Sequence, residues 1–329
     1  MLKFPLLHMK PKILITRQVF PEIVAALTQQ FEIDHNEGDE IFTAETLRVR
    51  AQGCAGVIAC LTEKIDVAFF DACPSVKVVS NIAVGYNNID VPEASKRGVK
   101  VTNTPGVLDD TTADLTFALL MATARRITET ERRLRNGEWK KGFALQQWLG
   151  TDIHHASLGI IGMGRIGQTI ARRASGFEMK VRYHNRTRLD AATEAKLNVT
   201  HASKQDILRE SDFVVVMVPY SPATHHLIKA EDIALMKPTA ILVNTARGGV
   251  VDDLALIAAL REQRIAGAGL DVFEGEPSLH ADFLKLDNVV LTPHIGSATR
   301  ATRMRMAALA AENMIAALAG KIPPNLINP

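Results

Sequence analysis

The sequence has few cysteines, few aromatic residues, no long hydrophobic run and almost no net charge. Its three cysteines lie in apolar or mixed segments, so we expect buried, reduced thiols (Cys54, Cys60, Cys73). No stretch approaches the roughly 18 apolar residues of a membrane span, and residues 1–8 are too short and interrupted for a signal peptide. A net charge of +2 without blocks of like charge argues against nucleic acid or a membrane as partner. We therefore expect a cytoplasmic protein.

The histidine pairs and the N-terminus carry little chemistry. The pairs at 154–155 and 225–226 have neither the i, i+4 spacing nor the neighbouring cysteines of a metal site, so no metal is expected. Met9 directly precedes the segment 10–15, which contains the first strand candidate. We therefore expect translation to begin at Met9 and residues 1–8 to be dispensable.

What the chain does have is the composition and pattern of an α/β protein. With 329 residues, 47% of them hydrophobic, it is long enough for about two domains. Between residues 12 and 104, short apolar runs alternate with helical segments, which predicts a parallel sheet with covered faces. The expected strands are Lys12–Thr16, Phe31–Asp34, Gly56–Cys60, Val76–Ile82 and Lys100–Asn103, and the expected helices are Pro21–Gln29, Ala44–Ala51, Asp66–Ala72 and Pro92–Arg97.

A second strand series follows a long helix expected at Thr111–Asn136, with Thr111 and Asp114 as its capping box. Its expected strands are Ser157–Gly162, Met179–His184, Asp212–Pro219, Thr239–Thr245, Ala266–Val272 and Asn288–Thr292. A last helix, Ala298–Leu318, can return to the first domain, although the pattern alone leaves this open. We expect a discontinuous first domain, 1–107 plus 298–329, and a second domain, 108–297.

The most informative motif is a glycine-rich turn between a strand and a helix. Gly162, Gly164 and Gly167 follow an apolar strand and open a helical segment, the arrangement that lets a pyrophosphate approach backbone N–H groups. The next strand ends at Asn185, where an NAD-binding turn would place a carboxylate. Arg186 and Arg188 follow, and a guanidinium can grip a 2′-phosphate. The turn therefore predicts a dinucleotide site that favours NADP(H).

Three later strands each end in a residue with catalytic potential. Arg247 precedes two glycines at a strand end and could orient a carboxylate or stabilise a developing oxyanion, although a lone arginine can equally be a surface charge. His294 follows Glu276 by 18 residues with a strand between them, so the two can meet at one sheet edge. A carboxylate beside an imidazole favours the protonated form, which can deliver a proton to a developing alkoxide.

These segments together resemble the D-isomer-specific 2-hydroxyacid dehydrogenases, most closely the glyoxylate/hydroxypyruvate reductase branch with the 2-ketogluconate reductases. The resemblance covers nearly all of residues 10–329. It is carried by Asn81–Asp90, Gly159–Gly167, Asn244–Gly248, Gly269–Phe273 with Glu276-Pro277, and Pro293–Thr299. It implies two Rossmann-like or flavodoxin-like domains with parallel sheets and an active site in the cleft between them. The first would bind substrate and the second NADP(H), with NAD(H) at lower efficiency.

The resemblance also implies roles for individual residues. Arg247 would bind the carboxylate and carbonyl of a 2-oxo acid, His294 would be the acid in reduction, and Glu276 would hold it. The other implied substrate contacts are Val84, Gly85 and Ser297. The other implied cofactor contacts are Arg165, Ile166, Asn185, Arg186, Thr187, Arg188, Pro219, Thr245, Asp271 and Gly296. The product would be a D-2-hydroxy acid.

The branch further implies a homodimer, in which a tryptophan of the polar arm near residues 137–150 can reach the partner's substrate site. Trp148 is the candidate, and packing is the simpler role for both it and Trp139. Three alternatives remain open: an adenosyl-dependent methyltransferase, a non-enzymatic NADP(H)-sensing regulator, and a dehydrogenase of the same fold acting on 3-phosphoglycerate or formate. The sequence does not distinguish glyoxylate, hydroxypyruvate and 2-ketogluconate as substrates.

Overall fold

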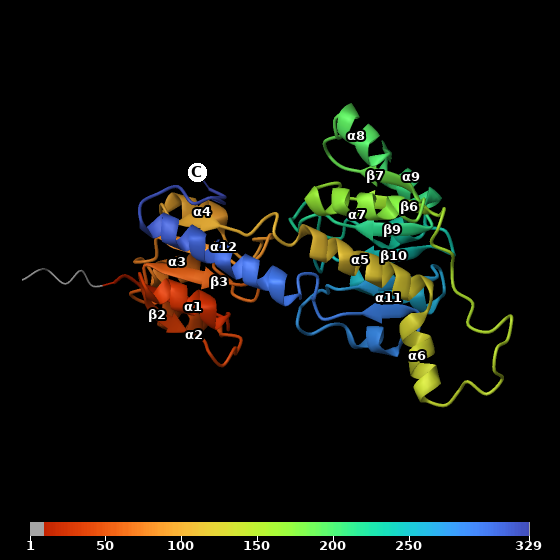
Figure 1. The fold of residues 1–329 in the computed structure, drawn as a ribbon, viewed down its shortest axis with the longest axis horizontal. Coiled ribbons are helices and arrows are strands. Elements are labelled where there is room, and N and C mark those ends of the chain that lie inside the picture. Colours follow the sequence, from red (N-terminus) through yellow and green to blue (C-terminus); the bar gives the residue numbers. More distant parts are fainter. Residues whose placement is uncertain (1–9, 329) are drawn as a thin grey trace, which may run out of the picture. The chain divides into compact units, whose positions relative to one another are not determined.

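The computed structural model describes residues 10–328, which divide into two compact units (Figure 1). The first unit comprises residues 10–108 and 299–328, and the second comprises residues 109–298. The chain passes from one unit to the other at two boundaries, and each boundary lies one residue later than expected from the sequence. The expectations for Met9 and residues 1–8 fall outside the described residues.

The first unit is built on a five-stranded parallel sheet. Its strands are β1 (Lys12–Ile15), β2 (Glu32–His35), β3 (Gly56–Ala59), β4 (Val78–Asn81) and β5 (Lys100–Thr102). They lie in the order β2-β1-β3-β4-β5, which is the flavodoxin-like arrangement. Strands β3 and β4 are buried along their whole length, as continuous apolar runs in a two-sided parallel sheet require.

Helices cover both faces of this sheet. They are α1 (Pro21–Thr28), α2 (Ala44–Ala51), α3 (Val67–Ala72), α4 (Val91–Lys96) and α12 (Arg300–Leu318). The last of these, α12, buries Met314 against the sheet, and Ser80 Oγ donates a hydrogen bond to its Ala310 carbonyl at 2.8 Å. The chain thus returns to its first unit at the C-terminus, the point that the sequence pattern left open.

The second unit contains a seven-stranded parallel sheet. Its strands are β6 (Ser157–Ile161), β7 (Lys180–His184), β8 (Val199–His201), β9 (Phe213–Val216), β10 (Ile241–Asn244), β11 (Gly267–Leu270) and β12 (Val289–Leu291). The strand order is β12-β11-β10-β9-β6-β7-β8. After β6 the chain adds β7 and β8 on one side and then returns to add β9 on the other side, so the strand order changes direction between β6 and β9, as in dinucleotide-binding sheets. Ligands bind such sheets beyond the carboxyl ends of the strands at this reversal.

The helices of the second unit pack on both faces of its sheet. They are α5 (Asp109–Ala124), α6 (Ile127–Arg135), α7 (Arg165–Ser175), α8 (Ala191–Leu197), α9 (Lys204–Glu210), α10 (Ala230–Ile233), α11 (Asp253–Arg261) and the 3-10 turn Ala281–Lys285. Alternate residues of β9 face opposite sides: Phe213 joins a core with α5 and α7, whereas Val214 joins one with α9 and α11. The expected α/β fold with parallel sheets is confirmed in both units.

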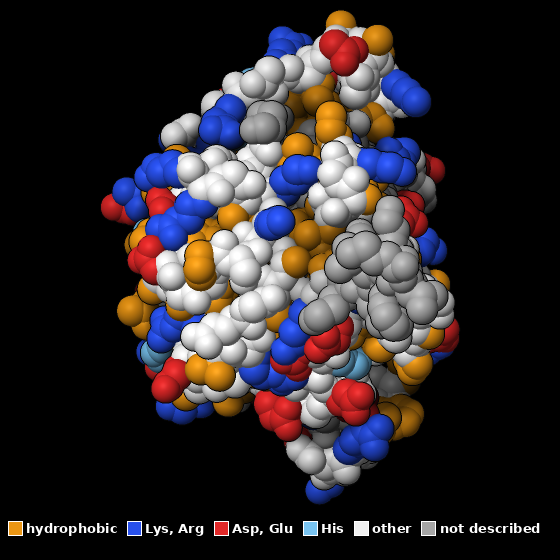
Figure 2. All heavy atoms as spheres, turned by 90° about the vertical axis from the view of Figure 1, so that its left-hand side faces the viewer, with side chains coloured by type: hydrophobic (Ala, Val, Ile, Leu, Met, Phe, Trp, Pro, Cys, Tyr) orange, Lys and Arg blue, Asp and Glu red, His pale blue; other side chains and the backbone are white. Residues whose placement is uncertain are grey.

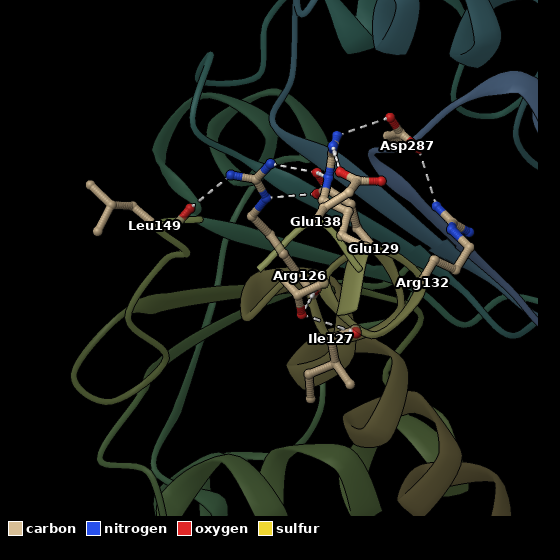
Figure 3. Close-up of polar contacts among 9 residues, drawn as sticks. Arg126, Ile127, Glu129, Arg132, Glu138, Leu149 and Asp287 are labelled. Carbon is tan, nitrogen blue, oxygen red and sulfur yellow. Dashed lines mark hydrogen bonds and ion pairs between the residues drawn. The ribbon is translucent and has the colours of Figure 1, made fainter. Parts of the chain in front are cut away.

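The single long helix expected at Thr111–Asn136 is wrong in two respects. It begins at Asp109, so Thr111 is not its cap, and it breaks between α5 and α6 at Arg126, which adopts a left-handed conformation (φ 53°). One contact at the break comes from outside the helix: Thr151 N–H donates to the Ala124 carbonyl at 2.8 Å. A second lies at the start of α6, where the Arg126 guanidinium binds Glu129 at 2.7 Å (Figure 3).

The surface carries charges of both signs side by side on the face shown in Figure 2. None of the helices between residues 10 and 328 is both long and apolar enough to cross a membrane. Within the same residues, no group of three or more His, Cys, Asp or Glu side chains is placed to hold a metal ion.

Candidate active site

The glycine turn connects β6 to α7 at the carboxyl end of the central strand. Gly162 has φ 108°, and a Cβ there would overlap the Met217 carbonyl of the neighbouring strand end. At Gly164, in contrast, a Cβ would meet no atom within 4 Å. Gly164 is also the N-cap of α7 and offers no side chain to cap it. The turn thus leaves open space at an uncapped helix N-terminus, which fits a pyrophosphate.

Arg165 and Ile166 are the first residues of α7. Their N–H groups have no acceptor within residues 10–328, as expected at a helix start. Gly167 lets the helix pack closely on the turn, because a Cβ there would overlap the Gly162 carbonyl. All five positions predicted to meet the pyrophosphate therefore form one continuous turn.

The segment after β7 lies against this turn. Asn185 Oδ1 accepts the Met163 N–H at 3.3 Å, and Asn185 Nδ2 donates to the Thr187 carbonyl at 3.1 Å. Arg186 is exposed, whereas Arg188 is paired with Glu194. No carboxylate occupies the strand end where an NAD-binding turn would place one, which fits a ribose carrying a 2′-phosphate.

Arg247 lies at the carboxyl end of β10. Its Nη1 donates to the Ala246 carbonyl at 2.7 Å, and Asn244 braces the turn by bonding the Arg247 carbonyl and the Ala246 N–H, each at 3.1 Å. Burial lowers the pKa of Arg247, and the charge of Glu276 partly offsets that effect. Its Nε is buried and has no partner among the described residues. An unsatisfied buried donor costs about 1–3 kcal/mol, so this group suits an anionic ligand.

Glu276 and His294 come from the segments after β11 and β12 and form a direct pair. Glu276 Oε2 lies 2.7 Å from His294 Nδ1, and each side chain is about one-third exposed. Burial raises the pKa of Glu276, but the hydrogen bond and charge of His294 outweigh that effect and lower it overall. The carboxylate is therefore ionised at neutral pH and accepts from Nδ1, which leaves Nε2 free to exchange a proton with a ligand.

Asp271 supports the segment that carries His294. Its carboxylate accepts hydrogen bonds from the Thr292 hydroxyl (2.6 Å), the Ile295 N–H (2.8 Å) and the Gly296 N–H (2.9 Å). The side chain is 1% exposed, and burial raises its pKa above the usual range for an aspartate. The structure thus gives Asp271 a positioning task in addition to the nicotinamide contact predicted for it.

The remaining predicted contacts of this unit lie at the same strand ends. Pro219 is exposed after β9, and Ser297 is half-buried after β12. Thr245 is different, because its hydroxyl is buried and lies 2.7 Å from the Thr116 hydroxyl of α5. Gly296 is buried and donates to Asp271, as described above. The four strand ends β9 to β12 therefore gather these residues in the second unit.

Val84 and Gly85 belong to the first unit, where they follow β4. Their carbonyls are held from behind: Asn103 Nδ2 donates to Val84 O at 2.8 Å, and Asn81 Nδ2 donates to Gly85 O at 2.9 Å. Neither N–H group has an acceptor within residues 10–328. This turn can therefore offer two adjacent N–H donors to a carboxylate.

Sequence reasoning missed the residues that hold the predicted ones. Asn81, Asn103 and Asn244 each stand at or just after a strand end and bond a neighbouring carbonyl, a position that could have singled them out. Glu194 has no comparable signal. It lies on α8, six residues after the arginine that it binds, a spacing that matches no regular helical pair.

Comparison with known proteins identifies the family of the chain. Residues 117–296 match the family profile "D-isomer specific 2-hydroxyacid dehydrogenase, NAD binding domain". The chain is 51% identical to a glyoxylate reductase of Pyrococcus horikoshii and 50% identical to one of Thermococcus onnurineus, over 97% of this chain and 96% of each relative. An NADPH-dependent glyoxylate/hydroxypyruvate reductase of Sinorhizobium meliloti, solved with NADP and malonate, superposes with a TM-score of 0.84 at 33% identity, covering 97% of both chains. The chain therefore belongs to the D-isomer specific 2-hydroxyacid dehydrogenase family, in the branch of the glyoxylate reductases.

Proposed function

We propose that this protein is an NADPH-preferring reductase of small 2-oxo acids, which it converts to D-2-hydroxy acids. Glyoxylate and hydroxypyruvate are the first candidate substrates, and 2-ketogluconate is a third. The observation that carries the proposal is the 2.7 Å pair of Glu276 and His294. The charge of Arg247 also helps to lower the pKa of Glu276, and the charge of Glu276 in turn raises that of Arg247. The relatives named above support the same substrate class.

Each residue has one task in the proposed reaction. Bound NADPH supplies a hydride to C2 of the 2-oxo acid. His294 Nε2 donates a proton to the carbonyl oxygen, and Glu276 keeps the imidazole oriented through Nδ1. Arg247 holds the substrate carboxylate and carbonyl oxygen with its unpaired Nε and remaining guanidinium donors. In the first unit, the N–H groups of Val84 and Gly85 take part in binding the carboxylate.

The cofactor preference follows from the segment after β7. Asn185 replaces the carboxylate that would repel a 2′-phosphate, and Arg186 and Arg188 add positive charge beside it. NAD(H) remains usable at lower efficiency, because the pyrophosphate turn at Gly162–Gly167 serves either cofactor. The crystal structure of the Sinorhizobium meliloti relative, which contains NADP, supports the proposed preference for NADPH.

A steady-state panel tests the proposal directly. The values of kcat/KM are measured for glyoxylate, hydroxypyruvate and 2-ketogluconate, each with NADPH and NADH. His294→Gln should lower the rate of reduction by about 10²–10⁴-fold while NADPH binding persists. Undiminished turnover in His294→Gln would refute the acid role, and a wild-type preference for NADH would refute the cofactor assignment.

We further propose that the protein acts as a homodimer through the arm at residues 137–150. Hydrophobic side chains stand out from this arm, with Phe143 90% and Leu145 81% exposed. Large exposed apolar side chains gathered in one segment are unusual on a monomer and typical of interfaces. The arm is anchored at its end, where Arg126 Nη1 donates to the Leu149 carbonyl at 3.3 Å (Figure 3). A second copy of the chain is the occupant we expect.

Light scattering after gel filtration checks the dimer. The double variant Phe143→Ser/Leu145→Ser should run as a monomer at concentrations where the wild type is dimeric, and a monomeric wild type would contradict the proposal. Trp148, which is half-buried in the arm, remains the candidate for reaching the partner's substrate site. The cytoplasmic location stays a prediction, which cell fractionation checks.

A further inference from the structure

The two arginines after β7 stand in different electrostatic situations. Arg186 is exposed and forms no ion pair or hydrogen bond with any residue from 10 to 328. Arg188 is held in a bidentate fork: Nε donates to Glu194 Oε1 at 2.8 Å, and Nη2 donates to Glu194 Oε2 at 2.7 Å. The Arg188 side chain is 65% exposed, whereas that of Glu194 is 11% exposed.

Glu194 is itself fixed in place. Its Oε1 accepts the hydroxyl of Tyr183 at 2.6 Å, and that hydroxyl in turn accepts the Leu189 N–H at 2.9 Å. Tyr183 lies on β7 and is completely buried. The hydrogen bonds from Arg188 and Tyr183 lower the pKa of Glu194 to about 2, so the carboxylate is ionised under all physiological conditions.

The same segment is also tied to the pyrophosphate turn. The Asn185 side chain links Met163 of that turn to Thr187, so the backbone segment that carries the two arginines is held beside the proposed dinucleotide site. A phosphate monoester near them carries a charge of about −1.5 to −2 at neutral pH. Every fixed charge within several ångströms therefore contributes to the choice between NADPH and NADH.

We propose that Glu194 is a specificity-determining residue that limits the preference for NADPH by cancelling the charge of Arg188. The inference rests on the proposed NADPH preference. Arg188 and Glu194 form one neutral unit, so Arg186 supplies the uncompensated positive charge. Arg188 still offers Nη1 and one Nη2 hydrogen, because its fork to Glu194 uses only Nε and one hydrogen of Nη2. It therefore contributes hydrogen bonds to the 2′-phosphate but little net attraction.

The opposing view is that Glu194 helps NADPH binding by holding Arg188 in position. The two views predict opposite signs for Glu194→Gln, which keeps an oxygen acceptor but removes the charge. We expect this variant to raise the NADPH/NADH ratio of kcat/KM by about three- to tenfold. We expect Arg188→Gln to lower the ratio, because it also leaves the Glu194 carboxylate unpaired. The double variant should have a ratio between those of the two single variants, because both charges are gone and the hydrogen bonds of Arg188 to the 2′-phosphate are lost with them.

Two control variants separate charge from structure. Tyr183→Phe loosens Glu194 without changing any charge, so it should leave the ratio unchanged. Glu210→Gln removes one negative charge from the pair that Glu210 forms with Arg182 of β7. Glu210 ends α9, where its carbonyl accepts the hydroxyl of Ser157 at the amino end of β6, opposite the glycine turn. This variant should also leave the ratio unchanged, and the effect of Glu194→Gln should weaken as ionic strength rises.

Binding without turnover provides the second measurement. The dissociation constants of adenosine 2′,5′-bisphosphate and 5′-AMP are measured by calorimetry on the full chain and its variants, and Glu194→Gln should tighten the bisphosphate selectively. A lower or unchanged ratio in Glu194→Gln, or an equal rise in Glu210→Gln, overturns the proposal. Failure of the proposed function gives a different result. In that case the wild type prefers NADH, and Arg186→Gln does not change the NADPH/NADH ratio. The effect of Glu194→Gln can still be measured from the dissociation constants of adenosine 2′,5′-bisphosphate and 5′-AMP.

Discussion

The main-chain carbonyl of Asp271 accepts the N–H of His294 at 3.0 Å, and His294 has a left-handed backbone conformation (φ 51°). Such a conformation is costly for a residue other than glycine and persists only where the surroundings enforce it. The Asp271 carboxylate completes the restraint by binding the two N–H groups that follow His294. The strand end of β11 therefore determines the direction of the imidazole that follows β12.

Asp271→Asn tests this restraint. An amide places an N–H donor where the carboxylate now accepts from Ile295 or Gly296, so at least one buried donor loses its partner. We expect a loss of about 1–3 kcal/mol in the free energy of unfolding and a lower kcat. Thr292→Val, which removes only the hydroxyl donor, should cost less. Urea unfolding measures both, and equal stability of the wild type and Asp271→Asn would contradict the restraint.

Glu276→Gln tests the pairing with His294. Removing the charge takes away the ionised acceptor that holds Nδ1–H, so the proton donor is oriented less firmly. We expect kcat to fall by roughly 10-fold or more, because glutamine still reaches Nδ1 but no longer carries a charge. The dissociation constant of NADPH should not change. An unchanged kcat in steady-state assays would mean that Glu276 does not support the proton donor.

Asn103→Ala tests the turn of the first unit. It removes the hydrogen bond to the Val84 carbonyl, which helps to hold the two free N–H groups in place. We expect the KM of the 2-oxo acid to rise by roughly 3–10-fold with a smaller change in kcat, because ground-state positioning is lost. The KM of the cofactor is the internal control, since its proposed contacts belong to the second unit. A KM that rises only for the cofactor would exclude this role.

Much of the fold can be predicted because the strands of a parallel sheet are short apolar runs in the sequence. The runs at Lys12, Gly56 and Ser157, for example, are all strands, each of which ends one residue earlier than expected. Strand β8 was missed because its three residues contain a single buried apolar side chain. The break of the helix at Arg126 could not be predicted from the local sequence either, because alanine and arginine are good helix formers. The break depends on a contact with Thr151, which is 25 residues further along the chain.

In the candidate site, too, some residues could be predicted from the sequence and others could not. Arg247, Glu276 and His294 could be predicted because strand ends in a parallel sheet face one edge, so chain order is enough to bring them together. The partners that orient them could not. Glu194 reaches Arg188 only because Tyr183 and α8 fold together, and the unpaired Nε of Arg247 depends on the packing around it. Such contacts are set by tertiary packing, which no local spacing encodes.

Arg126→Gln tests the anchor of the arm (Figure 3). The Glu129 carboxylate is only 5% exposed, and the hydrogen bond from Arg126 is the main reason that its pKa is lowered. Losing the fork leaves Arg133, at 3.0 Å, as its remaining cationic partner among the described residues. We expect a loss of about 1–3 kcal/mol in the free energy of unfolding and faster proteolysis within residues 137–150.

The neighbouring Arg132 offers a matched control for that variant. It pairs with Asp287 at 3.2 Å, but both side chains are more than half exposed, so Arg132→Gln should change stability by less than about 1 kcal/mol. Equal losses in the two variants would show that the Arg126 fork is an ordinary surface pair.

Asp253 should give the protein a distinctive pH dependence of stability. Its side chain is 7% exposed at the start of α11, where Oδ2 accepts the Glu274 N–H at 3.0 Å. Burial is the main cause that raises its pKa to about 6, and the charges of Glu274 and Asp252 add to it, against the opposing Glu274 N–H and His226. Because an unfolded aspartate has a pKa near 3.8, the folded state binds more protons between about pH 4 and 6. The free energy of unfolding therefore falls as the pH rises through this window.

Asp253→Asn removes this dependence, because the amide stays neutral and can still accept the Glu274 N–H. The stability of the variant relative to the wild type should increase between pH 4 and pH 7, by at most ~3 kcal/mol for a shift of about two pKa units. Urea unfolding at pH 4, 5, 6 and 7 measures the difference. Asp152→Asn is the control, since that side chain is 89% exposed and its removal should leave the pH dependence of the wild type intact. If the curves for Asp253→Asn and the wild type run parallel, the buried carboxyl group does not titrate in this window, and burial alone does not destabilise its charged form.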